Sequence, residues 1–430
     1  MVSQLRGDMR NARRASGMVW ARFAREAGFG EAYLRNVENG NRSVTAEVAA
    51  AYDRVLQTGG AFVASLQETG STSGRHAPWD QSGSLAVFDS LLNGSGVDRR
   101  GLLSAGAALS VSASSWARAL EVRSAGGKPE PLPSGPALLT HVDDRLSYLR
   151  HLDDELGSGE VFQLARSELS LIVRLIKSGR YDGPTRVRLH SMAAEAARQV
   201  AWAAFDQGRP GIAERFFEAS LRASAEAADP VSGAYALSFA AIQCYSTPGQ
   251  AGRAVALLET AREQVKHKAT PLMHAMLAAR VARALSMTGA RKESARQLDL
   301  ARAALDRGRH DDDPKVLYWV GYGEIEMIAG SAALQLGDPA EAVCRFEAAM
   351  GASYPGDDEY PRSHAIYLAR GAEAHLAMGD LDAALSSARH AARCLGSVDS
   401  ARSATELKGL REKLAAHTAH AAVREFLQGG

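Results

Sequence analysis

The side chains best suited to contact another molecule by charge lie near the N-terminus. Residues 1–57 carry nine arginines against six aspartates and glutamates, a net charge of +3, so the rest of the chain carries 1 − 3 = −2. Arginine pairs with phosphates and makes a two-point contact to guanine, and glutamate accepts a hydrogen bond from cytosine. This positive excess is what a module that binds nucleic acid needs.

The apolar residues of the same segment predict the element that positions these side chains. Ala24 is small enough to let two helices cross closely, and Gly28 suits a sharp turn between them. Leu34 and Val37 have the spacing to pack a second helix against a first that carries Phe23. A helix-turn-helix requires this combination.

The stretch over residues 9–56, with Glu38-Asn39-Gly40 near its centre, resembles the phage-repressor family of helix-turn-helix regulators, also called the xenobiotic-response-element family. Two positions depart from the family. Val19-Trp20 stands where the family often has Ser or Thr followed by Gln, and Gly30 stands at the usual capping hydroxyl. These departures concern individual phosphate contacts and not the fold.

The resemblance implies helices over residues 4–15, 19–27 and 31–39, with a fourth after Thr45. It also implies two sets of contacts to double-stranded operator DNA, bound by a homodimer. The residues that face base edges would be Glu31, Ala32 and Arg35, with Tyr33 and Asn36 close to bases or backbone. The residues that contact phosphates would be Arg14, Arg22, Asn41 and Arg42. The alternative is that these are solvated helix charges.

The C-terminal part of the chain contains an internal repeat. Five glycines recur at spacings of 41, 40, 48 and 42 residues, namely Gly208, Gly249, Gly289, Gly337 and Gly379. Five residues after each glycine comes a small residue, namely Ala213, Ala254, Ser294, Ala342 and Ala384. Seven before stand Ala201, Ile242, Ala282, Gly330 and Ala372, and nine after stand Phe217, Leu258, Leu298, Phe346 and Ala388. A glycine turn, small crossing residues and a larger groove-filling residue predict helical hairpins.

Over residues 187–395 this pattern resembles the tetratricopeptide repeat, although its period exceeds the usual 34 residues of that family. The resemblance implies a concave surface lined by the first helix of each hairpin, which would bind a peptide, a small molecule or a protein. The inward residues would be Arg198, Trp202, Gln243, Arg283, Tyr322, Glu324 and Glu373, with Tyr318 and Trp319 nearby. The alternative places Trp202 in the core and the charges in solvent.

A helix-turn-helix joined to such repeats resembles peptide-responsive quorum-sensing regulators of Gram-positive bacteria. Those receptors clamp the peptide backbone with asparagines, whereas no asparagine follows Asn93 in this chain. A bound peptide would therefore have to be held by glutamine and arginine. A pure adaptor with a vestigial helix-turn-helix domain is the alternative function.

The whole composition predicts an all-α protein, because alanine, leucine, arginine and glutamate dominate. We expect three parts: a helix-turn-helix domain at residues 1–66, a linker at residues 67–135 and an α-solenoid of helical repeats at residues 136–430. The linker would contain short helices near residues 85–92 and 100–120. A final apolar stripe through Leu407, Leu410, Leu414, His417 and Ala421 would cap the array or pair two subunits.

Enzyme chemistry has no support in the sequence. Nucleotide-binding, zinc-protease and nucleophile-elbow motifs are missing, and the three cysteines have no metal-ligand spacing. We therefore expect neither catalysis nor a metal or other cofactor. No apolar run reaches 18 residues, so we expect a cytoplasmic protein with no membrane partner.

Overall fold

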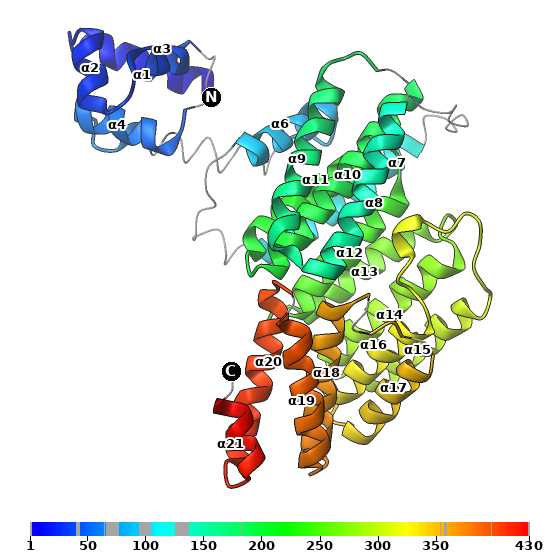
Figure 1. Cartoon of the computed structure of the whole chain (residues 1–430). Coiled ribbons are helices and arrows are strands. Elements are labelled where there is room, and N and C mark those ends of the chain that lie inside the picture. The colour runs from blue at the N-terminus through cyan, green and yellow to red at the C-terminus, as the bar shows by residue number, and fades with distance from the viewer. Residues whose placement is uncertain are drawn as a thin grey trace. The chain divides into compact units, whose positions relative to one another are not determined.

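The computed structural model of the chain is all α-helical, as predicted, with no strand among the residues described. These are residues 2–39, 44–63, 65, 77–93, 105–124, 137–181, 183–352, 354–356, 359–396 and 398–428. The chain divides into two compact units, residues 1–99 and 100–430, each described here by itself (Figure 1). The domain limits expected at residues 66 and 135 stay predictions.

The first unit consists of short helices, and the first four of those described surround one apolar core. The described helices are α1 (Val2–Ala15), α2 (Trp20–Ala27), α3 (Glu31–Glu38), α4 (Ala46–Leu56) and α6 (Gln81–Asn93). Gly28 ends α2 with a φ of 79°, a left-handed conformation that favours glycine, as predicted for the turn. Thr45 caps α4 by accepting a hydrogen bond from the Val48 amide at 3.3 Å. Leu34 and Val37 are fully buried in the core that joins α1 to α4.

The second unit consists of consecutive helices. They are α7 (Ala105–Ser124), α8 (Ala137–Leu156), α9 (Ser158–Lys177), α10 (Gly183–Asp206), α11 (Pro210–Glu226), α12 (Pro230–Tyr245), α13 (Ala251–Val265), α14 (Pro271–Met287), α15 (Arg291–Leu305), η2 (Lys315–Leu317), α16 (Tyr322–Gln335), α17 (Pro339–Gly351), α18 (Pro361–Ala377), α19 (Leu381–Leu395), α20 (Ala401–Leu414), η3 (Ala415–His417) and α21 (Ala421–Gln428). None of the described helices is long and apolar enough to cross a membrane.

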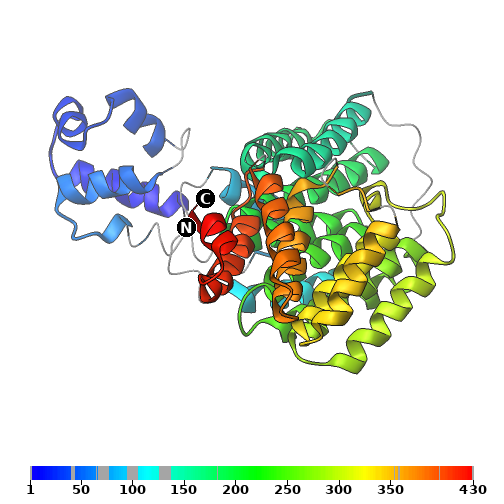
Figure 2. The same ribbon diagram turned by 60° about the horizontal axis from the view of Figure 1, so that its bottom comes forward.

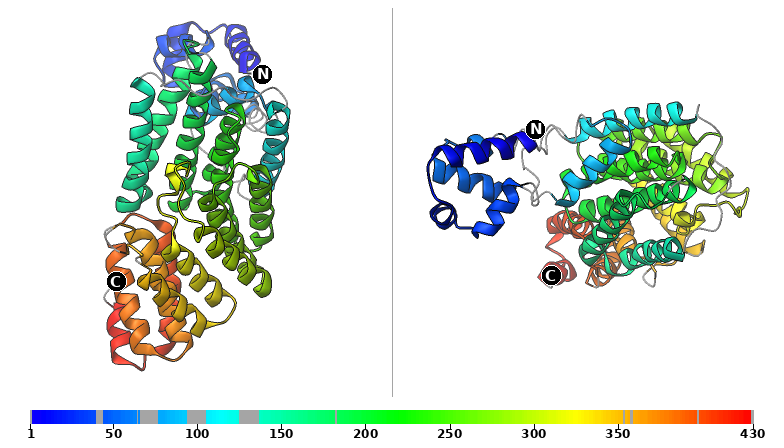
Figure 3. Two further views of the ribbon diagram at one scale, coloured as in Figure 1. Left: turned by 90° about the vertical axis from the view of Figure 1, so that its right-hand side faces the viewer. Right: turned by 90° about the horizontal axis from the view of Figure 1, so that it is seen from above.

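Helices α10 to α19 form five hairpins, α10/α11 through α18/α19, whose members lie side by side. The colours from green to orange in Figures 2 and 3 follow these pairs. The five aligned glycines all adopt φ between 72° and 81° in the turns. The five small residues that follow them are buried, with at most 1% of their surface exposed. The predicted hairpins are confirmed in residues 183–395, and the reason is local: left-handed turns need glycine and close crossings need small side chains.

The segment that follows α8 meets the segment that precedes α20. Gly157, between α8 and α9, forms a parallel bridge with Asp399, directly before α20. Ser400 donates a hydrogen bond to Asp206 at 3.0 Å, and Arg362 forms an ion pair with Asp153 at 2.6 Å. These contacts join the end of α10 to the start of α20, and α18 to α8.

The C-terminal helix packs against the last hairpin. Leu410 and Leu414 of α20 are fully buried in a cluster with residues of α18, α19 and α21, as capping of the array would require. The predicted single stripe is wrong beyond Leu414, because the α-helix gives way there to the short η3 and leaves His417 and Ala421 exposed.

Candidate functional site

The face of α3 that points away from the core carries the predicted base-contacting residues. Ala32 and Arg35 are exposed and Glu31 is half-buried. Arg35 pairs with Glu31, one turn earlier, at 2.6 Å, and its guanidinium lies 5.3 Å from the Trp20 ring centre. Exposed ion pairs of this kind contribute little to stability, so both side chains can exchange partners at low cost.

The other predicted DNA contacts lie in different surroundings. Tyr33 stacks on Phe29 with ring centres 5.7 Å apart, and Asn36 is half-buried. Two of the three arginines expected at phosphates, Arg14 on α1 and Arg22 on α2, are exposed, and Arg22 pairs with Glu26 at 2.9 Å. The other predicted phosphate contacts, Asn41 and Arg42, lie outside the described residues.

A buried network holds α3 in place, and the sequence analysis missed it. Glu38 accepts hydrogen bonds from Nε and NH2 of Arg13 at 2.8 and 3.0 Å and from the Tyr52 hydroxyl at 2.9 Å. The hydrogen bond to Glu38 raises the pKa of Arg13, and burial, followed by the Glu38 charge, raises that of Tyr52. Glu38 thus ties α1 and α4 to α3.

The second unit contains a pocket where helices α8, α10, α12, α14, α16, α18 and α20 converge. It encloses about 840 Å³ of space not filled by atoms, part of it open to solvent. Eight aromatic side chains line it, together with five arginines and three carboxylates. We call this the aromatic pocket.

The aromatic pocket brings together three of the predicted ligand residues. Trp202 donates its indole N–H to Asp153 at 3.1 Å, so its edge is satisfied. Arg198 is buried and binds both oxygens of Glu195, at 2.9 and 3.1 Å. Burial alone would raise the pKa of Glu195, but Arg198, Arg150 and Gln199 together outweigh burial and lower this pKa to about 2. Glu324 is the third residue, and it accepts a hydrogen bond from the Tyr367 hydroxyl at 2.7 Å.

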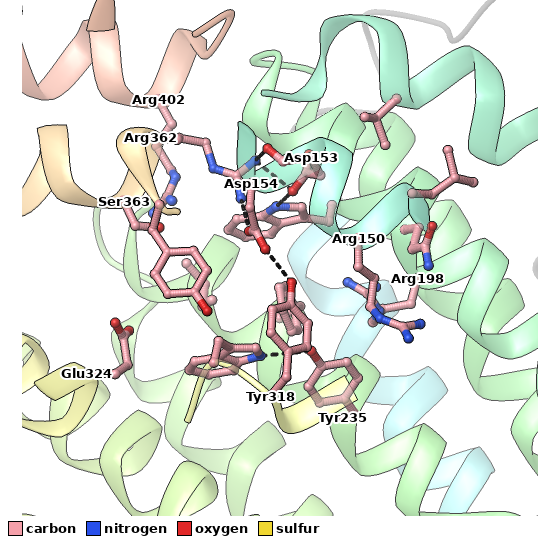
Figure 4. Close-up of a pocket in the computed structure, with 18 of the residues that line it drawn as sticks. Arg150, Asp153, Asp154, Arg198, Tyr235, Tyr318, Glu324, Arg362, Ser363 and Arg402 are labelled. Atoms are coloured by element: carbon pink, nitrogen blue, oxygen red, sulfur yellow. Dashed lines mark hydrogen bonds and ion pairs between the residues drawn. The ribbon is translucent and has the colours of Figure 1, made fainter. Parts of the chain in front are cut away.

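An acidic pair on α8 meets an arginine of α18 in this pocket. Figure 4 shows Arg362 beside Asp153 and Asp154, with the Tyr318 hydroxyl directed at Asp154. Burial raises the pKa of Asp154 to about 7, although Arg362 opposes the shift. The sequence offered no signal for this group, because Asp153 and Arg362 are 209 residues apart.

Four predicted ligand residues do not line the aromatic pocket. Gln243 is buried and donates to Glu214 at 3.0 Å, which is a structural role. Tyr322 is exposed and bonds to Asp306. Glu373 pairs with Lys413 at 2.5 Å, and Arg283 lines a smaller neighbouring pocket. The repeat offsets correctly identify the first helix of each hairpin, but they do not determine which way each side chain on that helix points.

A second group of side chains is able to hold a metal ion. His364 of α18 and His390 and Cys394 of α19 place their donor atoms within 4.8 Å of one another, with His364 and Cys394 buried. Imidazole nitrogen and thiolate sulfur are ligands that Zn²⁺ prefers. The spacing along the chain concealed this group, because only the pairing of α18 with α19 brings it together.

Among the described residues, the exposed face of α3 carries side chains predicted to contact bases, and the aromatic pocket brings together three of those predicted to contact a ligand. Comparison of the chain with protein-family models, with curated proteins and with solved structures finds no match. Its function has to be inferred from these two sites.

Proposed function

We propose that this chain is a sequence-specific DNA-binding transcriptional regulator. In this proposal α1–α4 form a helix-turn-helix domain of the phage-repressor kind, and the helices from α8 to α20 form a tetratricopeptide-like array that binds a signal. The observation that carries the proposal is the division of α3 into two faces. One face carries Leu34, Val37 and Glu38, which are buried. The other face carries Ala32 and Arg35, which are exposed. A helix held in this way can enter the major groove and present its side chains to base edges.

Selection of bound sequences from random DNA with the full-length protein tests this function. A dimer should select inverted half-sites whose centres lie about one helical turn, or a multiple of it, apart. Failure to enrich any sequence would refute specific DNA binding, and enriched sequences without a dyad would refute the dimer.

Two substitutions then separate base contacts from phosphate contacts. Arg35→Ala should cost about 1 to 3 kcal/mol on the selected site and relax one base position. Arg14→Ala should weaken binding to all DNA sequences similarly and reduce the slope of log affinity against log salt concentration by about 1. Arg296→Ala, an exposed change in the second unit, is the matched control. If Arg35→Ala leaves affinity and preference unchanged, α3 is not the recognition helix.

The second part of the proposal is that the aromatic pocket binds an amphipathic small molecule or peptide. Its aromatic rings offer stacking surfaces, and its arginines and carboxylates offer polar contacts to both signs of charge. A ligand that favours one conformation of the protein with roughly 1 to 3 kcal/mol of coupling would change operator affinity 5- to 150-fold.

Operator affinity measured with and without small-molecule extract of the native cells tests this coupling. Trp319→Leu removes a ring that lines the pocket, and the matched control Tyr322→Phe changes an exposed aromatic residue outside it. We expect the response to be lost in the first variant and kept in the second. Equal responses in both variants would place the signal elsewhere.

A further inference from the structure

A second pocket adjoins the aromatic pocket and is lined by positive charge. It encloses about 410 Å³ of space not filled by atoms, part of it open to solvent, and shares Arg280, Ser363, Tyr367 and Arg402 with the aromatic pocket. Arg283 and Arg370 complete its charged lining, and no aspartate or glutamate is among the described residues that line it. We call it the arginine pocket.

Two of these arginines are neutralised by acids just outside the lining. Arg370 forms an ion pair with Glu406 at 2.6 Å, and Arg402 lies 3.4 Å from Asp206. Their charge is thus accounted for within the folded chain.

Arg283 has no such acid. Its side chain is buried, and one NH group donates to the Ser286 hydroxyl at 2.9 Å and contacts the Met287 sulfur at 3.0 Å. Neither the buried Nε of Arg283 nor that of Arg280, one turn earlier on α14, has a hydrogen-bond partner among the described residues. No described carboxylate lies within ion-pair distance of Arg283. Burial, together with the charge of Arg370, lowers the pKa of Arg283 to about 10.

A buried guanidinium without a counter-charge is unfavourable for the folded chain alone. A hydrophobic residue of similar length would fill the same space without this cost. The arrangement becomes favourable when an anion enters, because the planar guanidinium matches two oxygens of a carboxylate or phosphate.

We infer that the arginine pocket binds an oxyanion, a carboxylate or phosphate group, carried by the ligand whose body fills the aromatic pocket. Arg280 and Tyr367 line both pockets, so one molecule can span them. The identity of the ligand as a signal rests on the proposed function, but the anion site can be tested without DNA.

The test uses the full-length protein and thermal unfolding in sodium phosphate, sodium acetate and sodium chloride at equal ionic strength. Arg283→Met keeps the length of the side chain and removes its charge. Arg291→Met is the matched control, because Arg291 is exposed and pairs with Asp338 at 3.6 Å on the surface. The control removes the general stabilising effect of phosphate from the comparison.

We expect saturable stabilisation by phosphate or acetate beyond chloride in the natural protein and in Arg291→Met, and its loss in Arg283→Met. The difference between phosphate and acetate identifies the preferred group. A hydrogen-bonded charge of this kind should account for roughly a 10- to 100-fold change in anion affinity. In chloride, Arg283→Met should unfold at a higher temperature than the natural protein.

Equal phosphate and acetate responses in Arg283→Met and Arg291→Met would overturn the inference. If Arg283→Met does not fold, Arg283→Lys keeps the charge but loses the planar fork, and an unchanged anion affinity in that variant would overturn it as well. If phosphate and acetate do not stabilise the natural protein but a ligand still changes its DNA affinity, the anion site is refuted and the proposed function is not. Anion binding without any effect of ligand on DNA affinity would refute the proposed regulation alone.

Discussion

Two helical glycines contact the same aromatic ring and should respond to alanine in opposite directions. A Cβ atom added to Gly330 of α16 would lie 2.7 Å from two carbons of the Phe346 ring, which is a clash. A Cβ atom added to Gly371 of α18 would lie 3.7 Å from the same ring, which is an ordinary contact. Alanine is better than glycine inside a helix by about 1 kcal/mol, so this gain is common to both substitutions.

The clash decides the difference between the two variants. Inserting a methyl group into a filled space costs about 1 to 3 kcal/mol. Gly371→Ala should therefore stabilise the second unit by up to about 1 kcal/mol. Gly330→Ala should be less stable than Gly371→Ala by about 1 to 3 kcal/mol, because the common helix gain cancels.

The repeat suggests a rescue. Where Gly330 faces Phe346, the preceding hairpin has Ala282 and Leu298 in the equivalent positions, and both are buried in one apolar cluster. The double variant Gly330→Ala/Phe346→Leu reproduces that pair, so it should recover most of the lost stability. A coupling of about 1 kcal/mol or more is expected for residues in direct contact.

Denaturant unfolding of the full-length variants, followed by helical circular dichroism, gives the midpoints to compare. Phe346→Leu alone completes the double-mutant cycle. If Gly330→Ala is as stable as Gly371→Ala, or if Phe346→Leu fails to rescue it, the assignment of the ring to the space beside Gly330 is wrong.

Two further substitutions test the buried charges. Burial raises the pKa of Asp154 to about 7, whereas the unfolded value is about 4, so the folded chain holds a proton in this window that the unfolded chain releases. Stability should therefore fall as the pH rises from roughly 4 to 7, and Asp154→Asn should flatten that part of the pH profile in denaturant unfolding; an unchanged profile would contradict the assignment. Glu38→Gln leaves Arg13 buried beside a neutral partner and should cost the first unit about 3 kcal/mol in thermal unfolding, while Glu31→Gln at an exposed pair should cost about 0.5 kcal/mol or less.

The helices and their turns could be predicted because their causes are local. A left-handed turn needs glycine wherever it occurs, so the recurrence of Gly208 and its four equivalents located the turn of every hairpin from α10 to α19. The same holds for Gly28 in the first unit, where a single glycine located the end of α2. Neighbours within one hairpin are close in sequence, and their spacing carries the information.

The exposed face of α3 could also be predicted from the sequence, but the buried hydrogen bonds that hold α3 in place could not. Leu34 and Val37 fix which side of the helix is buried, and Arg35 then falls on the other side. Glu38 drew attention only as part of a motif. Its hydrogen bonds to Arg13 and Tyr52 form only where α1, α3 and α4 meet. The spacing of residues within one helix does not indicate which other helices pack against it.

The pockets lie beyond local reasoning for a physical reason. An arginine in the first helix of a hairpin has the same neighbours in sequence whether it points to solvent or inward, and its surroundings are decided by the curvature of the whole array. Trp202 and Gln243 occupy equivalent repeat positions, six residues before Gly208 and Gly249, yet Trp202 lines the aromatic pocket and Gln243 bonds to Glu214. Helices α8 and α20 then add Asp153 and Arg402 from outside the repeats. Arg402 lines both pockets and Asp153 lines the aromatic pocket, so a ligand that fills the aromatic pocket can contact α8, α20 and the first helices of the hairpins at once.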